Sequence, residues 1–508
     1  MEKKDPHQST EMRATDLKAM VENHSFSEGK DIDLGRILEV ETTPRIERKV
    51  LWKIDWIMIP LMGLCYMLQY MDKLALSQTA LFNIRADLGL HGMQYSWASA
   101  IFYFGYLVWS WPTAYMIVRF PIGKYLSISV FLWGGILMCH AACKNFGGLM
   151  AARFFLGVGE AAIAPGFALI TGMFYKREEQ PLRQAAWFIG NCVANTVGGI
   201  VGYGIGHIDR TSLSSWQLIF LILGAVTSGY AVIMFFFLPD SPANAIFLKK
   251  HERAIALQRT LANKTGILDA GKFQKSHVWL ALKDPQAWLL VVYTFCVNLC
   301  NGGITTFSVI LVEGFGYSTF KVLLISMPSG AAQLIFLLLT STFATFFRSF
   351  RIIMMIVNCL VAMVGYLLIY KLDEDARVAK MAGLCLGAVF AANIPLSLSL
   401  ITSNVAGMTK KSVVSAMLFI AYCVGNIVGP QFYLASEEPI YQTGIRSAIS
   451  GLALGIIALL SLYTYYTREN RRRDRIYGSP DALTVDQELQ FELLNVTDKE
   501  NESFRYLL

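Results

Sequence analysis

The sequence predicts an all-α integral membrane protein with twelve membrane-spanning helices, arranged as two six-helix bundles related by pseudo-symmetry. Three observations support this prediction: a very apolar composition, about twelve long apolar runs, and a similarity between the two halves of the chain. Hydrophobic residues make up 54% of the 508 residues, and charged residues make up only 16%. This composition is too apolar for a water-soluble chain.

Each apolar run is long enough to cross roughly 30 Å of hydrocarbon as a helix. No cleavable signal peptide precedes the first run, because residues 1–50 are polar and charged, so the first run is expected to direct insertion itself. The expected spans are residues 54–77, 95–118, 124–143, 149–173, 185–206, 216–238, 286–312, 321–345, 351–370, 380–402, 412–434 and 444–467.

Lysine and arginine are enriched in cytosolic loops of membrane proteins. When the N-terminus is placed in the cytosol, the cytosolic connections and the C-terminal tail hold the larger set: Arg119, Lys124, Lys176, Arg177, Arg183, Arg348, Arg351, Lys410, Lys411, Arg468, Arg471, Arg472, Arg473 and Arg475. The opposite side holds Arg85, Lys144, Arg210, Lys371, Arg377 and Lys380. We therefore expect both termini to be cytosolic. The net charge of +7 mostly reflects this bias, and we expect no nucleic-acid partner.

A long polar connection at residues 239–285 divides the chain, and a short amphipathic helix could start at Ser241 and Pro242 within it. The expected organisation is a disordered cytosolic N-terminus (1–50), an N-terminal six-helix bundle (51–238), a cytosolic linker (239–285), a C-terminal six-helix bundle (286–467) and a cytosolic tail (468–508).

The two bundles resemble each other in sequence. "LGVGEAAIAP" at 156–165 matches "LGAVFAANIP" at 386–395 at five of ten positions, and "FIGNCVANTVG" at 188–198 matches "FIAYCVGNIVG" at 419–429 at seven of eleven. The offsets of 230 and 231 are nearly equal, so spans 4 and 5 correspond to spans 10 and 11. Two parallel repeats favour a transporter with a substrate site at the bilayer midplane between the halves.

Span 4 contains two charged residues, Arg153 and Glu160, and their repeat equivalents are Gly383 and Phe390. A charge near the bilayer centre costs from about 3 to more than 10 kcal/mol. Residues seven apart lie within about 20° on a helix and roughly 10 Å apart along it, so these two share a face. Because the second half lacks both charges, the pair favours a functional role in the first half.

Span 1 ends in "YMLQYMDKLALS", where Tyr66, Gln69, Tyr70 and Lys73 share one helical face and Asp72 lies beside it. The helix directions place Lys73 and Arg153 in the outer third of the membrane and Glu160 deeper. Two cations at similar depth above a buried acid are typical of an anion site combined with a protonation site.

Structural alternatives remain for these residues. Lys73 and Asp72 could form an interfacial pair, and Arg153 could simply neutralise Glu160 or cap backbone carbonyls. Glu160 could be an inert structural carboxylate. All nine cysteines lie within the expected spans and are interpreted as small core residues, so we expect neither a metal nor a cofactor other than protons as the coupling ion.

The motifs "YMDK", "RFFLGVGEA…PG" and "FYKREEQPLR" resemble the anion:cation symporters of the major facilitator superfamily. "LPDSPANAIFL", "NVAGMTKKSVV", "GNIVGPQ" and the ending "NVTDKENESFRYLL" are similar to the fungal allantoate permease subfamily. The resemblance covers roughly residues 45 to 508. It implies an importer, at the plasma membrane and monomeric, of a small organic anion by proton symport with alternating access; an internal membrane is the alternative location.

The resemblance maps an Asp-Arg pair of the family onto Asp72 and Lys73, so a lysine here replaces the usual arginine. It also maps the arginine and glutamate of span 4 onto Arg153 and Glu160. The loop "IVRFPIGKY" lacks the acidic residue that the superfamily usually carries there. The implied substrate is a carboxylate such as allantoate or a vitamin acid, or a related sulfonate or amino-acid-like compound.

We therefore expect proton coupling by Glu160 and Asp72. The expected substrate-binding residues are Lys73, Arg153, Tyr66, Gln69, Tyr70, Asn191, Asn195, Asn298, Asn301, Asn393, Tyr422 and Asn426. Two alternatives use the same sequence features: a proton-independent facilitator or antiporter, and a non-transporting nutrient sensor, which the short tail disfavours. An enzyme is not expected, because no Ser/His/Asp or metal-ligand spacing occurs in or beside the spans.

Overall fold

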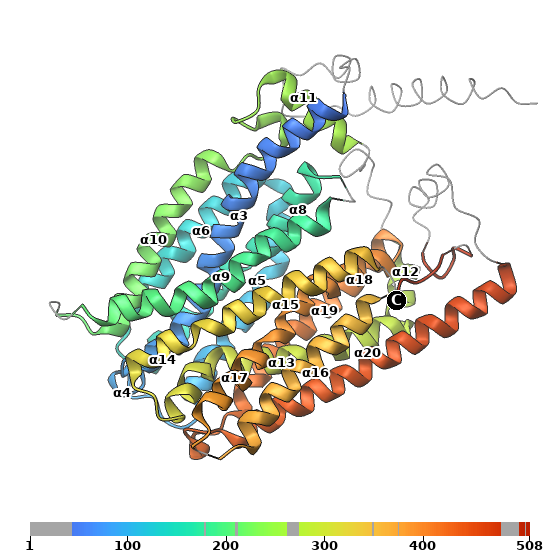
Figure 1. Ribbon diagram of the computed structural model, residues 1–508. Coiled ribbons are helices and arrows are strands. Elements are labelled where there is room, and N and C mark those ends of the chain that lie inside the picture. The colour runs from blue at the N-terminus through green and yellow to red at the C-terminus, as the bar shows by residue number, and fades with distance from the viewer. Residues whose placement is uncertain are drawn as a thin grey trace, which may run out of the picture.

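Long helices running side by side form the body of the molecule in the computed structural model (Figure 1). The structure describes residues 43–176, 179–208, 212–261, 274–347, 350–373, 375–478, 497–502 and 504–508. Within these ranges every regular element is a helix, which confirms the predicted all-α class. Disorder was expected for residues 1–50; residues 1–42 lie outside the described residues, and residues 44–50 instead form the start of a helix.

The first half begins with α3, which starts at Pro44, ten residues before the expected span. Proline is well suited to the first turn of a helix because its missing N–H would be unpaired there in any case. The helices of this half are α3 (Pro44–Ala80), α4 (Ile84–Asp87), α5 (Gln94–Arg119), α6 (Ile122–Cys139), η1 (His140–Ala142), α7 (Phe146–Glu160), α8 (Ile163–Phe174), α9 (Gln180–Gly206) and α10 (Ser215–Phe237).

The connection between the halves contains more helix than the sequence suggested. A single turn, η2 (Pro242–Asn244), forms where one short helix was expected to begin, and two separate helices follow it, α11 (Lys250–Leu261) and α12 (Lys275–Lys283). Helix α11 packs against α3 and α8 of the first half, whereas α12 packs against α19 of the second.

The second half ends with α20, which continues to Tyr477, ten residues beyond the expected span. Its helices are α13 (Pro285–Gly314), α14 (Thr319–Ile325), α15 (Met327–Phe346), α16 (Arg351–Lys371), α17 (Arg377–Gly387), η4 (Ala388–Ala392), α18 (Asn393–Asn404), α19 (Met408–Val428), η5 (Gly429–Phe432), η6 (Ala435–Glu437) and α20 (Gln442–Tyr477).

Eleven helical segments of the described chain are long and apolar enough to cross a membrane. The remaining expected span, 95–118, corresponds to α5. Its tryptophan, tyrosine and serine residues lower its mean hydropathy, because aliphatic residues dominate such scales. Helix α5 nevertheless packs closely against α7 and contacts α19 of the second half.

The two spans matched by the internal repeat are interrupted at equivalent places. Helix α7 ends at Glu160 before α8 begins, and α17 gives way to the 3-10 turn η4 before α18. Pro165 and Pro395 are repeat equivalents, and each stands three residues after the last residue of the interruption, Ala162 in the first half and Ala392 in the second. A proline inside a helix removes one hydrogen bond and clashes with the carbonyl four residues earlier, which accounts for both breaks.

The bundle has two distinct ends. We call the end where α3 begins and α20 finishes the terminal end, and the end where α3 finishes and α4 lies the loop end (Figure 1). The two halves meet mainly along three helix pairs, α9 with α15, α5 with α19, and α3 with α13, with smaller contacts of α9 with α14 and α18. The substrate site was predicted to lie between the halves, where these helix pairs meet.

Candidate functional site

Four charged side chains gather inside the first half, and we call Asp72, Lys73, Arg153 and Glu160 the charged cluster. Lys73 and Asp72 come from α3, and the other two come from α7. The Nζ of Lys73 lies 3.5 Å from Oε2 of Glu160. The Glu160 side chain is fully buried, whereas that of Lys73 is 15% exposed. The structure thus brings these four predicted residues together.

Arg153 does not pair directly with Glu160. Its Nε donates a hydrogen bond of 3.1 Å to the carbonyl oxygen of Ala98 on α5, and its guanidinium lies 5.5 Å from the centre of the Phe102 ring. Lys73 lies over the same ring at 5.5 Å. Phe102 therefore contacts both cations, as expected for a ring whose face attracts positive charge. Of the two structural roles considered for Arg153, the direct ion pair with Glu160 is not formed, whereas the capping of a backbone carbonyl is.

Asp72 is hydrogen-bonded to α6 of its own half. Its Oδ2 accepts a hydrogen bond of 2.5 Å from Nε1 of Trp133, and its side chain is fully buried. The sequence reasoning missed Trp133. A tryptophan in an apolar span is usually a packing residue, and only the approach of α6 to α3 reveals its indole N–H as a hydrogen-bond donor to the cluster.

Aromatic residues surround the charged cluster on the side of the second half. Tyr106 of α5 stacks on Phe419 of α19 with ring centres 5.4 Å apart, and Tyr103 meets Tyr422 edge-to-face at 5.9 Å. Tyr66 packs instead against Trp187 of α9, with ring centres 4.8 Å apart. Tyr422, predicted to bind substrate, therefore contacts the first half, while Tyr66 lies among aromatic residues of its own half.

A separate cavity of about 80 Å³ lies between the two halves. Tyr70 and Gln78 of α3 line it from the first half, and the wall contains polar but no charged side chains. Its lining residues are Tyr70, Leu74, Gln78, Asn195, Gly199, Asn301, Ile304, Thr305, Ser308, Val309, Leu323, Ser326, Ser329, Gln333, Leu384, Ala388, Phe390 and Ala391. Of the predicted binding residues, Tyr70, Asn195 and Asn301 lie here. The cavity and the charged cluster are neighbours through α3.

One hydrogen bond crosses between the halves on the cavity wall. Nδ2 of Asn195 on α9 donates to Oε1 of Gln333 on α15 at 2.8 Å. Gln333 is only 1% exposed, and its Nε2 has no hydrogen-bond partner among the described residues. The sequence reasoning missed Gln333, although a glutamine within an apolar run is a signal of the same kind as Asn195.

Three other predicted asparagines form a chain within the second half. Asn301 donates to Oδ1 of Asn426 at 2.8 Å, and Asn426 donates to Oδ1 of Asn298 at 3.1 Å. Asn426 is the repeat equivalent of Asn195, yet these hydrogen bonds join α19 to α13 within one half instead of crossing between the halves. Of the three, only Asn301 reaches the cavity wall.

Three further predicted residues, Asn393, Asn191 and Gln69, also lie outside the cavity wall. Asn393 is used in packing α18 against α16, since it donates to the carbonyl of Met355 at 3.0 Å and accepts from Asn358 at 2.8 Å. Asn191 and Gln69 are buried within the first half, where Gln69 lies close to Glu160. Among the described residues, no group of three or more His, Cys, Asp or Glu side chains could hold a metal ion.

The halves are joined firmly at the loop end. Arg85 forms two hydrogen bonds of 3.0 and 2.7 Å with the carboxylate of Glu438. Nearby, Tyr95 donates to the carbonyl of Thr306 at 3.2 Å, and the hydroxyl of Ser99 lies 2.7 Å from that of Thr306. Within the described parts of the chain, Arg85–Glu438 is the only ion pair that crosses between the halves.

Ion pairs at the terminal end stay within one half and its neighbouring linker helix. Lys176 pairs with Glu47 at 3.0 Å, and Arg259 of α11 pairs with Glu179 at 2.6 Å. In the second half, Lys410 pairs with Asp284 at 2.6 Å. Among the described residues, an ion pair therefore joins the halves at the loop end and none joins them at the terminal end.

Comparison with known proteins places this arrangement among transporters. The sequence profile of the Major Facilitator Superfamily matches residues 62–430. An uncharacterised transporter of Schizosaccharomyces pombe is 36% identical over 471 residues, covering 92% of this chain and 88% of that protein. The allantoate permease of Saccharomyces cerevisiae is 33% identical over 482 residues, covering 92% and 88%. A thiamine pathway transporter of the same yeast is 31% identical over 495 residues, covering 96% and 91%.

Solved structures agree on the fold. The proton:xylose symporter XylE matches with a TM-score of 0.64 at 14% identity, covering 82% of this chain and 96% of that chain. A bacterial homologue of the human lysosomal transporter Spinster, in an inward-facing and unoccupied conformation, matches with a TM-score of 0.60 at 16% identity, covering 83% and 97%. The expected resemblance and the expected fold are both confirmed, and the relatives are transporters rather than enzymes.

Proposed function

The chain belongs to the Major Facilitator Superfamily of transporters, and from this premise we propose that it imports a small organic anion together with a proton by alternating access. The single observation that carries this proposal is the ion pair between Lys73 and Glu160. One member of the pair is fully buried and the other is partly exposed, so an anion can reach the lysine but not the glutamate.

Coupling between proton uptake and anion binding follows from the charge balance of the cluster. With all four side chains ionised, the charged cluster has two positive and two negative charges and is neutral. Binding a substrate anion to Lys73 alone would leave a net negative charge in a region of low dielectric, which is costly. A proton taken up by Glu160 restores neutrality and frees Lys73 for the substrate. This argument predicts one proton for each monovalent anion.

The cavity between the halves suits the uncharged part of such a substrate. Its wall offers amide and hydroxyl groups, including Nε2 of Gln333, which has no hydrogen-bond partner in the described part of the chain. Tyr70, on the cavity wall, and Lys73 share a face of α3 less than one turn apart. A small anion could therefore place its polar body in the cavity and direct its carboxylate towards Lys73.

The substrate class follows from this chemistry. A single ammonium suits a carboxylate or a sulfonate and discriminates less between geometries than a guanidinium would. The name of the allantoate permease, 33% identical to this chain, supports a carboxylate that also carries amide-like groups. We place the protein in the plasma membrane as a monomer, with both termini in the cytosol, so that the loop end faces outwards.

The test is an uptake assay in cells that express the full chain. Labelled carboxylates, among them allantoate, and their matched neutral amides are supplied at an external pH of about 5 and of about 7.5, where a proton gradient is present or small. The expected result is acid-stimulated uptake of an anion, absent for its amide and lost in Glu160→Gln.

Glu313→Gln is the matched control, because Glu313 lies at the end of α13, where Thr319 hydrogen-bonds to it, outside the charged cluster. Uptake that is equal at both pH values in the unmodified protein and in Glu160→Gln would reject proton symport. It would favour a facilitator or antiporter instead. Binding without any uptake would favour the sensor.

A further inference from the structure

The last described residues of the chain, 497–502 and 504–508, lie against the terminal end of the second half, beside α12 and α20 (Figure 1). We call these two described stretches the C-terminal strap. Its hydrogen bonds reach α13, α16, α18, α19 and α20, so one short segment bonds to five helices, each of which packs directly against only two of the others. Residues 479–496 connect it to α20, and their placement lies outside the described residues.

A buried ionic centre anchors the beginning of the strap. Lys410 of α19 is fully buried, and its Nζ lies 2.6 Å from both Oδ1 of Asp498 and Oδ2 of Asp284. Asp498 also accepts a hydrogen bond of 3.1 Å from Gln286 of α13. A buried lysine with two carboxylates needs a further cation nearby, and Lys499 of the strap lies 3.7 Å from Asp284. The strap thus supplies one charge of each sign, and the centre is neutral.

Side chains of the bundle bind the main chain of the strap. Asn470 accepts from the backbone N–H of Tyr506 at 2.9 Å and donates to the carbonyl of the same residue at 2.8 Å. Asn404 does the same for Leu507, with both distances 2.8 Å. Two asparagines from different helices therefore bind successive residues of the strap as a neighbouring strand would.

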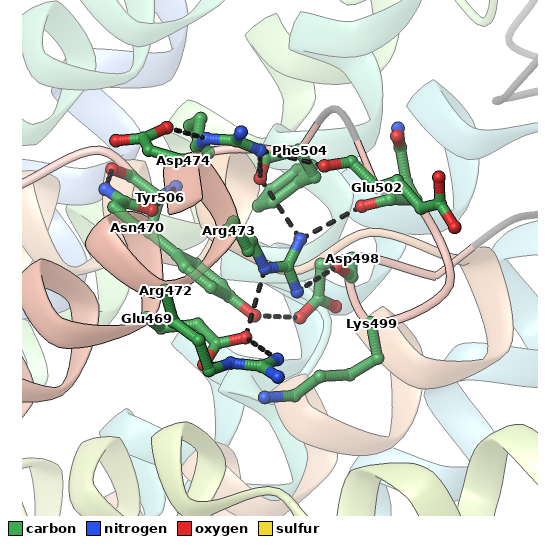
Figure 2. A network of polar contacts seen from close by, with 12 residues as sticks. Glu469, Asn470, Arg472, Arg473, Asp474, Asp498, Lys499, Glu502, Phe504 and Tyr506 are labelled. Atoms are coloured by element: carbon green, nitrogen blue, oxygen red, sulfur yellow. Dashed lines mark hydrogen bonds and ion pairs between the residues drawn. The ribbon is translucent and has the colours of Figure 1, made fainter. Parts of the chain in front are cut away.

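Arg473 of α20 makes the densest set of contacts with the strap (Figure 2). Its guanidinium donates to the backbone carbonyls of Asp498, Asn501 and Phe504 at 2.8, 2.9 and 3.1 Å. The residue is only 3% exposed. A buried guanidinium without these carbonyls would retain few partners, because its remaining described hydrogen bond goes to Glu469 of its own helix.

Tyr506 of the strap packs against α20 and hydrogen-bonds to the ionic centre. Its ring stacks on Tyr466 of α20 with centres 4.8 Å apart and planes 6° apart, and its hydroxyl donates to Asp498 at 2.8 Å. Burial, together with Asp498, raises the pKa of Tyr506 above its usual value, so the phenol keeps its proton and remains a donor.

The linker between the halves is held at the same place. Nε2 of His277 on α12 lies 3.7 Å from the carboxylate of Glu500 in the strap. The backbone N–H of Gln274, just before α12, donates to Thr409 of α19 at 3.4 Å. Helix α12 of the linker therefore meets the second half beside the strap.

We propose that the terminal end of the second half is a peptide-binding site whose ligand is the chain's own C-terminal strap. Its docking joins five helices and linker helix α12 into one rigid body. The transport consequence rests on the proposed function: if the halves rock about a central site, an undocked strap leaves the second half too loose to move as a unit. The docking itself does not depend on that function.

Docking is tested without transport by limited trypsin digestion of the full-length protein in lipid nanodiscs. Lys499 and Arg505 are the cleavage sites within the strap, and their side chains are 30% and 16% exposed. Arg473→Ala should accelerate release of the terminal peptide about tenfold or more, because cleavage follows the population of the undocked form. Arg471→Ala, on the exposed face of α20 two residues away, is the control and should leave the rate unchanged.

A second measurement adds a synthetic peptide of residues 497–508 to the protein truncated after Gly478. The truncated protein should melt at a temperature about 5 °C or more lower than the full chain, because each kcal/mol moves the Tm of a unit of this size by roughly 2–4 °C. The peptide should restore part of the loss, and a peptide with Asp498→Asn and Tyr506→Ala should not.

The outcomes separate the two proposals. The docking proposal would be overturned if Arg473→Ala, Arg471→Ala and the unmodified protein were cleaved at equal rates. It would also be overturned if truncation left the Tm unchanged. Faster cleavage of Arg473→Ala, together with no acid-stimulated uptake of any anion by the unmodified protein, would support docking of the strap and reject the proposed symport. Faster cleavage in Arg473→Ala with uptake unchanged would confine the strap to stability and overturn its role in transport.

Discussion

Lys73 of α3 forms an ion pair with Glu160 of α7, with 3.5 Å between Nζ and Oε2, although Arg153 occupies the same face of α7 as the glutamate. The pair therefore joins two helices instead of two turns of one helix. Arg153 is held by the carbonyl of Ala98 and by the ring of Phe102. The two cations thus have separate tasks: Lys73 balances the acid, and Arg153 fixes α7 against α5.

Replacing Lys73 with methionine should abolish uptake and destabilise the protein, because it leaves Glu160 buried and without its ion-pair partner. Breaking a buried pair from one side costs about 3–5 kcal/mol. The double variant Lys73→Met/Glu160→Gln should recover most of the thermal stability but no anion uptake. Melting temperatures in detergent and labelled uptake are the two measurements. A double variant that transports the anion would remove Lys73 from the binding site.

Removing the amide of Gln333 should weaken substrate binding at the cavity wall. Gln333→Leu deletes the bond to Asn195 and the Nε2 donor. The expected rise in KM is roughly five- to a hundredfold, the equivalent of about 1–3 kcal/mol for a polar group left unpaired. Gln431→Leu is the control, because Gln431 belongs to η5 and does not line the cavity. Equal KM values in both variants would show that the cavity is not the binding site.

The sequence predicted the fold and the members of the charged cluster because both depend on rare local signals. Charged residues inside apolar runs are uncommon, so Asp72, Lys73, Arg153 and Glu160 stand out without any knowledge of helix packing. The internal repeat was equally readable, and Pro165 and Pro395 account for the two equivalent helix breaks.

The pairing within the site could not be predicted, because it depends on how helices approach one another. Seven residues along α7 separate Arg153 from Glu160 by roughly 10 Å, which leaves room for Lys73 to reach the acid from α3. Asn393 and Asn195 are both asparagines within apolar runs. The side chain of Asn393 makes its hydrogen bonds between α16 and α18, whereas Asn195 lines the cavity. Only the three-dimensional arrangement separates them.

Opening the loop end should be controlled by Arg85 and Glu438. The hydrogen bonds to Glu438 raise the pKa of Arg85 above its usual value, so Arg85 keeps its positive charge at every pH below the pKa of a free arginine. Raising the pH within that range therefore does not break the contact. Arg85→Ala should instead increase labelling of a cysteine introduced at Ser308, on the cavity wall, by an impermeant thiol reagent added from outside.

The exchange Arg85→Glu/Glu438→Arg should return that labelling to the level of the unmodified protein, since it restores the pair in reverse. The control is the same set of variants with Ser308 left in place, which measures the reaction of native cysteines. Labelling that is as slow in Arg85→Ala as in the parent would show that the contacts of Tyr95 and Ser99 with Thr306 suffice to hold the halves together.

Close contact between α5 and α7 depends on Gly157. A Cβ at this position would lie 2.0 Å from the carbonyl oxygen of Phe102, and no side-chain movement can relieve a clash with backbone. Gly157→Ala should therefore separate α5 from α7, displace Phe102 from the two cations and destabilise the fold by about 1–3 kcal/mol or more. Gly135→Ala is the matched control, because nothing lies within 4 Å of a Cβ there. Thermal melting of the purified variants decides the matter: equal melting temperatures would mean that the two helices are not held in contact at Gly157.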